Sequence, residues 1–117
     1  MGRETVLYHN PRCSKSRQTL ALLEERGVDF RIVEYLKDPP SAQEVLKLAE
    51  LSGIQPHELV RTKEPEYREA GLCDESSDED IASAIAACPK LLERPIVVHE
   101  GAATIGRPPE RVLEILD

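Results

Sequence analysis

The chain has 117 residues and a formal net charge of −7. Hydrophobic residues make up 40% of it and charged residues 32%, a composition typical of a soluble globular protein, so we expect residues 1–117 to form a single domain. The acidic balance and the small number of aromatic residues argue against nucleic-acid binding, because phosphates favour Lys and Arg and bases stack on aromatic rings. No stretch approaches the ~20 apolar residues that a membrane span needs.

The start of the sequence and its cysteines indicate where the protein is located and whether it binds a metal. The first residues contain no apolar signal core. The three cysteines, Cys13, Cys73 and Cys88, form neither an even disulfide framework nor the paired spacing of a zinc site. We therefore expect a cytoplasmic protein that binds no metal.

The first three predicted elements form a β-α-β unit. Residues 5–9 are a short β-rich run that ends at an Asn-Pro turn signal. Residues 14–26 carry an apolar helical face and stop at Gly27, and residues 28–35 form a second strand-like run. A helix between two strands predicts parallel strands joined by a right-handed crossover.

A helical segment follows. Ser41 and Glu44 form the pattern of a capping box, and the helix that they open ends at Gly53. Residues 54–75 indicate short helical pieces around two prolines, and Ser77 precedes a further helix that closes near residue 89.

The last part of the chain returns to strands. Residues 96–99 and 103–105 predict an antiparallel hairpin, and Pro108-Pro109 opens a final helix. The order β-α-β, a helical insertion, then β-β-α predicts an α/β fold with a mixed four-stranded sheet.

The segment around Cys13 carries most of the chemical information. It reads His-Asn-Pro-Arg-Cys-Ser-Lys-Ser-Arg and joins the end of the first strand to the start of the first helix. Unpaired N–H groups and the positive end of the helix dipole stabilise a thiolate there, and Arg12, Lys15 and Arg17 add positive charge. The same groups bind oxyanions. We infer that Cys13 is a nucleophile with a lowered pKa, beside an anion site.

Two neighbours of Cys13 have open roles. Ser16 stands where a C-x-x-C motif would have its second cysteine, so a redox cycle at Cys13 requires an external thiol. Its hydroxyl can donate to a bound anion or thiolate, or it can cap the helix. His9, at the strand end, either tunes the charge of Cys13 or has a structural role.

Three motifs together resemble the glutaredoxin-coupled arsenate reductase family, and most closely its short bacterial members. They are H-N-P-R-C-S-K-S-R, R-P-I-V-V and I-G-R-P-P-E, which occur in the family's order and span nearly the whole chain. The resemblance implies a thioredoxin-like fold with a helical insertion. It also implies a cis proline at Arg94-Pro95, the position where such folds carry one beside the active cysteine.

The resemblance also implies roles for individual residues. Cys13 matches the family's nucleophile, and His9 matches a residue thought to lower its pKa. Arg61, Arg94 and Arg107 match the arginine triad that binds the oxyanion, and we place Ser16 among the substrate-binding residues. The implied reaction reduces arsenate to arsenite with glutathione as co-substrate and glutaredoxin as donor, without a tightly bound cofactor.

Two other functions remain open at this point. A thiol-disulfide oxidoreductase acting on glutathione mixed disulfides would use the same cysteine without the arginines. A thioredoxin-like regulator that binds RNA polymerase would share the order of elements, but such regulators typically carry a C-x-x-C switch that Ser16 removes here.

Overall fold

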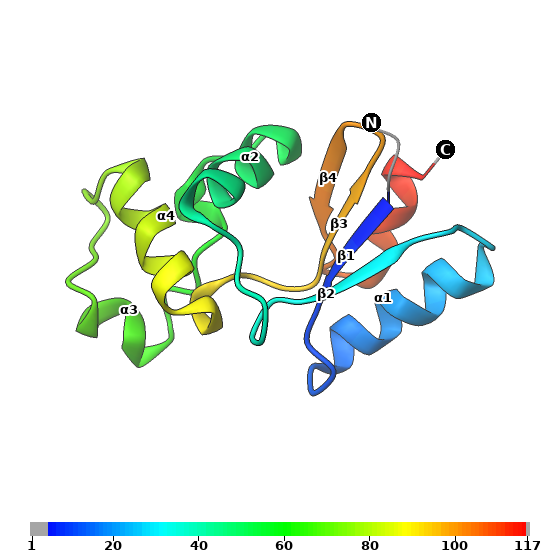
Figure 1. Cartoon of the computed structure of the whole chain (residues 1–117), viewed down its shortest axis with the longest axis horizontal. Coiled ribbons are helices and arrows are strands. Elements are labelled where there is room, and N and C mark those ends of the chain that lie inside the picture. Colours follow the sequence, from blue (N-terminus) through cyan, green and yellow to red (C-terminus); the bar gives the residue numbers. More distant parts are fainter. Residues whose placement is uncertain (1–4, 117) are drawn as a thin grey trace. The chain divides into compact units, whose positions relative to one another are not determined.

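The computed structural model describes residues 5–116 (Figure 1). These residues form two compact units: the first comprises the chain up to Asp38 and from Arg94 onward, and the second is Pro39–Glu93. The expectation of one domain over residues 1–117 stays a prediction. Within residues 5–116, no helix is long and apolar enough to span a bilayer.

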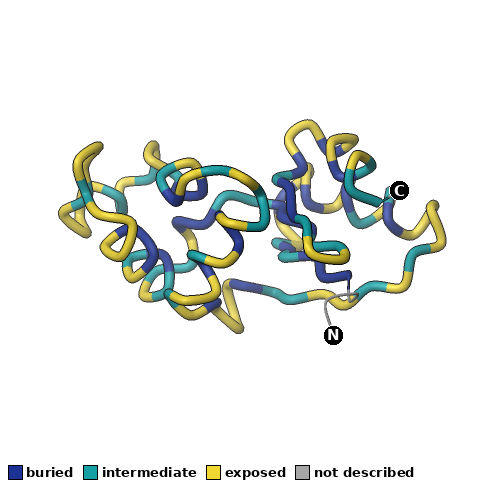
Figure 2. Tube along the Cα trace, turned by 90° about the horizontal axis from the view of Figure 1, so that it is seen from above, coloured by how far each residue is buried: buried dark blue, intermediate teal, exposed yellow. Residues whose placement is uncertain are grey.

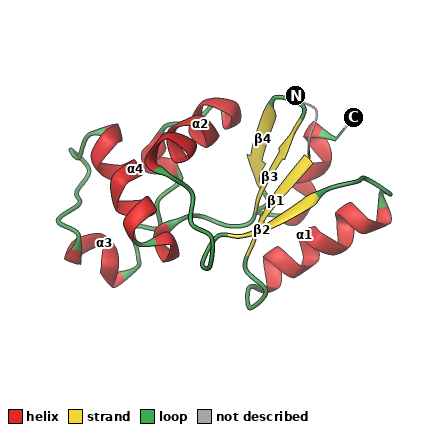
Figure 3. Ribbon diagram, in the orientation of Figure 1, coloured by secondary structure: helices red, strands yellow, loops and turns green. Residues whose placement is uncertain are grey.

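The first unit is built on a mixed four-stranded sheet (Figure 3). Its strands are β1 (Thr5–His9), β2 (Arg31–Glu34), β3 (Ile96–His99) and β4 (Ala102–Ile105), in the order β2-β1-β3-β4. β1 pairs with β2 in parallel and with β3 antiparallel, and β3 pairs antiparallel with β4. The predicted α/β fold, with β-α-β, a helical insertion and β-β-α, is confirmed.

Strand β2 is shorter than the run 28–35 that the sequence predicts. At its start, the N–H of Val28 bonds the carbonyl of Leu23, so this residue still belongs to the end of the preceding helix. At its end, the N–H groups of Lys37 and Asp38 both bond the carbonyl of Glu34 and begin a turn. Local hydrogen bonds at both ends therefore limit the strand.

Two helices of the first unit share one core with the sheet. They are α1 (Ser14–Glu25) and η3 (Pro109–Ile115), and the fully buried side chains of this core include Leu7, Leu23, Val97 and Val112. Figure 2 shows how burial varies along the chain. Element η3 is a 3₁₀ helix rather than the α-helix expected, since its terminal bonds join residues three apart, from Arg111 to Pro108 and from Leu116 to Leu113.

The second unit is helical. Its elements are α2 (Ala42–Ser52), η1 (Pro56–Glu58), α3 (Pro65–Glu69), α4 (Asp78–Ala87) and η2 (Pro89–Leu91). The capping box of Ser41 and Glu44 is present at the start of α2, and Gly53 ends that helix with a φ of 70°. Ser77 caps α4 by accepting a hydrogen bond from the N–H of Asp80. These three signals were all predicted.

Gly106 follows β4 directly, at a position with no room for a side chain. A Cβ built there would lie 2.9 Å from Thr19 Oγ1, 3.0 Å from Pro95 Cγ and 3.3 Å from Val112 Cγ1. We expect Gly106→Ala to destabilise the protein by about 1–3 kcal/mol, because overpacking forces neighbouring groups to move. Urea unfolding would measure the loss, and an unchanged midpoint would show that these neighbours yield without cost.

Candidate active site

Cys13 begins helix α1. Its backbone is extended, with φ −95° and ψ 123°, and it occupies the N-cap position. Its N–H bonds the carbonyl of Asn10 at 2.9 Å, and its carbonyl accepts from the N–H of Arg17 at 3.0 Å. The thiol therefore lies where the free N–H groups of the first helical turn point, and the residue is only 8% exposed.

The topology brings two of the predicted arginines to the same place. Because β2 and β4 run parallel to β1 while β3 runs antiparallel, the ends of β1, β2 and β4 and the start of β3 lie at one edge of the sheet (Figure 1). Cys13 follows β1, Arg94 precedes β3 and Arg107 follows β4. One thiol and two arginine residues therefore lie at this edge of the sheet.

The Arg107 side chain lies between the backbone of Arg94 and the sulfur of Cys13. Its Nε donates to the carbonyl oxygen of Arg94 at 2.8 Å, while its Nη2 lies 3.9 Å from Cys13 Sγ. These two contacts fix the side chain beside the sulfur. The Arg94-Pro95 peptide bond is cis, as the resemblance implies, and so is Arg107-Pro108, which we did not predict.

Both guanidinium groups keep unused charge and donors. Neither Arg94 nor Arg107 forms an ion pair with a carboxylate within residues 5–116, and the Nε of Arg94 is buried without a hydrogen-bond partner in that range. A buried unpaired donor is costly, and a planar guanidinium suits a tetrahedral oxyanion. The arrangement is therefore suited to an anion bound next to Cys13 Sγ.

The same surroundings favour the thiolate form of Cys13. Burial on its own raises the pKa of the thiol, but the backbone N–H of Ser16 and the charge of Arg94 lower it. The N–H of Lys15 and the charge of Arg107 lower it further, and the net pKa is below the ordinary cysteine value. The side chains that we expected to contribute, at positions 12, 15 and 17, are not among these groups.

Ser16 and His9 form a buried, hydrogen-bonded pair. Ser16 is fully buried, and its Oγ lies 2.7 Å from His9 Nδ1 and accepts from the N–H of Asn10 at 3.0 Å. Burial lowers the pKa of His9, Glu34 raises it and Arg17 lowers it, with a net decrease. His9 is therefore mainly neutral at neutral pH.

This pairing refines what was expected of both residues. A neutral His9 brings no positive charge to Cys13, and it is not among the groups that lower the pKa of that thiol. The Ser16 hydroxyl is engaged with His9 and Asn10, while its backbone N–H stabilises the thiolate. A catalytic role for His9 and a substrate contact for Ser16 stay predictions.

Ser16→Ala separates these two functions of the residue. The change removes the bond to His9 and leaves the Asn10 N–H without its partner, so we expect a loss of about 1–3 kcal/mol of stability. The pKa of Cys13 should change little, because the backbone N–H at position 16 remains. Urea unfolding and ultraviolet titration of the thiol measure the two effects, and a clearly raised thiol pKa would contradict this division.

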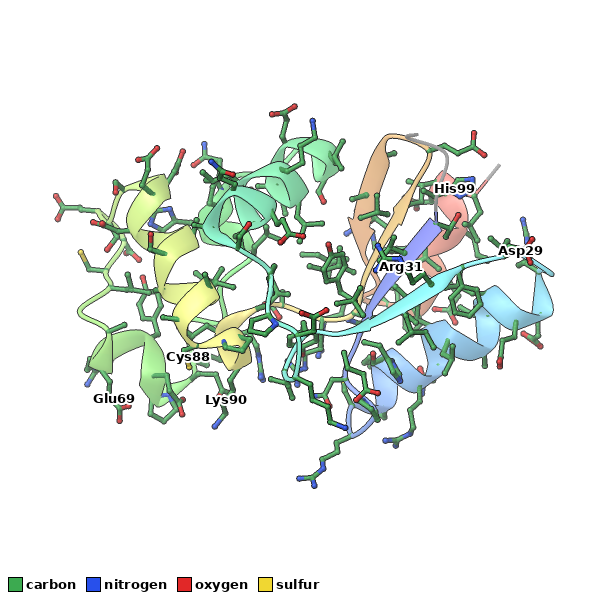
Figure 4. All side chains as sticks on the ribbon, in the orientation of Figure 1. Asp29, Arg31, Glu69, Cys88, Lys90 and His99 are labelled. Atoms are coloured by element: carbon green, nitrogen blue, oxygen red, sulfur yellow. The ribbon has the colours of Figure 1, made fainter. Side chains whose placement is uncertain are left out.

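Arg61 lies in the second unit, where it has a carboxylate partner. Its Nη2 is 3.1 Å from Glu64 Oε1, and its backbone N–H bonds the carbonyl of Leu91 at 2.7 Å. Lys90, labelled in Figure 4, extends the pair by lying 3.4 Å from Glu64 Oε2 and 3.3 Å from Glu66 Oε2. The participation of Arg61 in the oxyanion site stays a prediction.

Asn10 is a positioning residue that we did not predict from the sequence. Its side-chain Oδ1 accepts from the N–H of Arg12 at 3.0 Å, and its carbonyl accepts from the N–H of Cys13. Arg17 supports the same loop by donating from Nη1 to the carbonyl of Pro11 at 2.9 Å. The signal was available, because Asn before Pro favours a turn closed by the asparagine side chain.

The chain matches a known protein family over most of its length. The family model described as the ArsC family matches residues 8–115. The chain belongs to the ArsC family. This residue range contains Cys13, both arginines of the sheet edge and the helical insertion, so the described site lies inside the family region.

Similar proteins cover nearly the whole length of this ArsC-family member. The uncharacterized protein YfgD of Escherichia coli K12 is 50% identical over 99% of both chains. An arsenate reductase of Neisseria meningitidis serogroup B is 44% identical over 97% of this chain and 98% of its own. The solved structure of an arsenate reductase from Vibrio cholerae superposes with a TM-score of 0.92 at 47% identity, covering 97% of this chain and 98% of that one.

Proposed function

We propose that this protein is an arsenate reductase in which the Cys13 thiolate is the nucleophile. The observation that carries the proposal is the group of backbone N–H donors around one buried sulfur, together with two guanidinium groups that have no carboxylate partner among the described residues. Such a site combines a nucleophile with stabilisation for a multiply charged tetrahedral substrate. The relatives named arsenate reductase support the same activity.

The first step forms a covalent bond between sulfur and arsenic. The Cys13 thiolate attacks arsenic(V), and one arsenate oxygen leaves as water after protonation. Arg94 and Arg107 offset the negative charge on the remaining oxygens. By the family resemblance, Arg61 is the third arginine of this set.

The electrons come from two external thiols. Glutathione displaces a second oxygen as water and forms a sulfur–arsenic bond. The glutaredoxin thiolate then attacks the glutathione sulfur, which gives a disulfide and leaves the bonding electron pair on arsenic, now arsenic(III). Water releases arsenite and restores the Cys13 thiol. One arsenate and two thiols thus yield one arsenite, one disulfide and one water.

This cycle suits Cys13 because Ser16, three residues later, stands where a second cysteine would be. A C-x-x-S motif has no neighbouring thiol to complete the exchange. We also propose the cytoplasm as the location, since its reduced glutathione pool keeps such thiols active. The protein requires reduced partners at every turnover.

The test is a coupled assay with glutathione, glutaredoxin, glutathione reductase and NADPH. We expect NADPH oxidation that depends on both arsenate and this protein. Turnover of glutathione mixed disulfides without any response to arsenate would instead support the thiol-disulfide oxidoreductase. Specific retention of RNA polymerase by a protein inactive in both assays would support the regulator.

A further inference from the structure

We propose that a pocket beside the Cys13 loop binds glutathione as the co-substrate, an inference that rests on the proposed function. The pocket has a volume of about 300 Å³ and lies wholly within the first unit. Residues 9–12 form one wall, and Glu34, Leu36 and Lys37 form the other. A volume at the lower end of the range for ligand sites suits part of a small peptide.

The strand register places this pocket at the same sheet edge as the nucleophile. His9 on β1 is paired with Glu34 on β2, so the loop after β1 and the turn after β2 lie next to each other. The sheet order β2-β1-β3-β4 puts the pocket on the β2 side of Cys13 and both arginines on the β3 and β4 side. With this placement, a thiol bound in the pocket and an oxyanion bound at the arginines would approach the sulfur from different sides.

The loop between the pocket and the sulfur is held by hydrogen bonds. The carbonyl of Asn10 accepts from the N–H of Cys13, and the side chain of Asn10 accepts from the N–H of Arg12. The same residues that line the pocket thus set the start of α1. A ligand seated on them would have a fixed position relative to Cys13.

The charges in the pocket complement glutathione. Arg12 and Lys37 are exposed cations, while Glu34 is the one carboxylate of the lining and lies 3.7 Å from Lys37 Nζ. Glutathione carries two carboxylates and one ammonium group, which match two cations and one anion in number and sign. Leu36, 45% exposed, adds an apolar surface beside them.

A reaction that needs no arsenate tests the pocket separately from the proposed function. The Cys13 thiolate attacks glutathione disulfide, forms a Cys13–glutathione disulfide and releases one glutathione thiolate. We compare the rate of this reaction with that of bis(2-hydroxyethyl) disulfide, which has the same reacting bond and no charge. All variants carry Cys73→Ser and Cys88→Ser, so that only Cys13 reacts.

In Arg12→Glu/Lys37→Glu we expect the ratio of the glutathione disulfide rate to the neutral disulfide rate to fall about tenfold, because two attractive charges become repulsive. Lys15→Glu/Arg111→Glu is the matched control with the same change in charge, since both side chains are exposed in the first unit but lie outside the pocket lining. Its ratio should change by no more than about twofold. Dividing by the rate with the neutral disulfide removes any change in the reactivity of the Cys13 thiol itself.

An unchanged ratio in Arg12→Glu/Lys37→Glu would overturn the pocket assignment. An equal fall in Lys15→Glu/Arg111→Glu would also overturn it, because it would indicate general electrostatic steering. If the ratio falls only in the pocket variant while the unsubstituted protein shows no arsenate turnover, the pocket binds glutathione and the proposed reductase activity fails. If arsenate is turned over but the ratio is unchanged, the reductase activity holds and the pocket assignment fails.

Discussion

Cys13→Ser should reduce arsenate turnover at least about 1,000-fold in the coupled assay, because a serine hydroxyl at neutral pH is a far weaker nucleophile than a thiolate. The fold should persist, since the side chains are similar in size and position 13 donates and accepts through its backbone. Circular dichroism and urea unfolding would check this. Cys73→Ser is the matched control, because Cys73 is exposed and lies in the second unit.

The control should retain full activity. Residual turnover in Cys13→Ser equal to that of Cys73→Ser would exclude Cys13 as the nucleophile. Loss of activity in both variants would mean that a second cysteine takes part in the cycle, which the proposed use of external thiols does not include.

Arg107→Ala should lower kcat/KM for arsenate about 100-fold. The change removes the Nη2 donor that lies 3.9 Å from Cys13 Sγ and the bond from Nε to the Arg94 carbonyl. It also removes a positive charge that lowers the pKa of Cys13, so that pKa rises toward the ordinary value. At any pH below the raised pKa a smaller fraction of the protein is thiolate, and the acid limb of the pH–rate profile shifts to higher pH.

Kinetics over a range of pH, together with ultraviolet titration of the thiol, measure both effects. Arg107→Lys should restore part of the thiolate fraction but less of the arsenate affinity, since an ammonium group keeps the charge without the planar fork of donors. Arg111→Ala, an exposed arginine of the same unit, should leave both quantities unchanged. An unaltered thiol pKa in Arg107→Ala would show that this arginine does not act on the sulfur.

Local signals predicted much of the fold. The apolar periodicity of residues 14–26, the capping box of Ser41 and Glu44 and the Ser77 cap each act within a few residues, and all three appear in the structure. The β-α-β order also predicted the parallel pairing of the first two strands. The position of Cys13 at the start of a helix followed from the same local reasoning.

The composition of the site depends on distant residues and was less predictable. Arg94 and Arg107 lie next to Cys13 because of strand order, and nothing in their immediate sequence distinguishes them from other arginines; only the family resemblance selected them. Conversely, the nearby side chain of Lys15 was expected to lower the thiol pKa, whereas its backbone N–H does so. Charged residues close to Cys13 in the sequence show that charge is present near it, but not where their side chains point.

The free guanidinium donors beside Cys13 have a consequence for selectivity inside a cell. Guanidinium and amide N–H groups respond to charge and tetrahedral shape, which phosphate shares with arsenate, so occupancy alone discriminates poorly between the two. Phosphate held there cannot accept an electron pair from thiols, whereas arsenic(V) can. Discrimination would then come from redox reactivity, with abundant phosphate acting as a reversible competitor that slows arsenate turnover without consuming thiols.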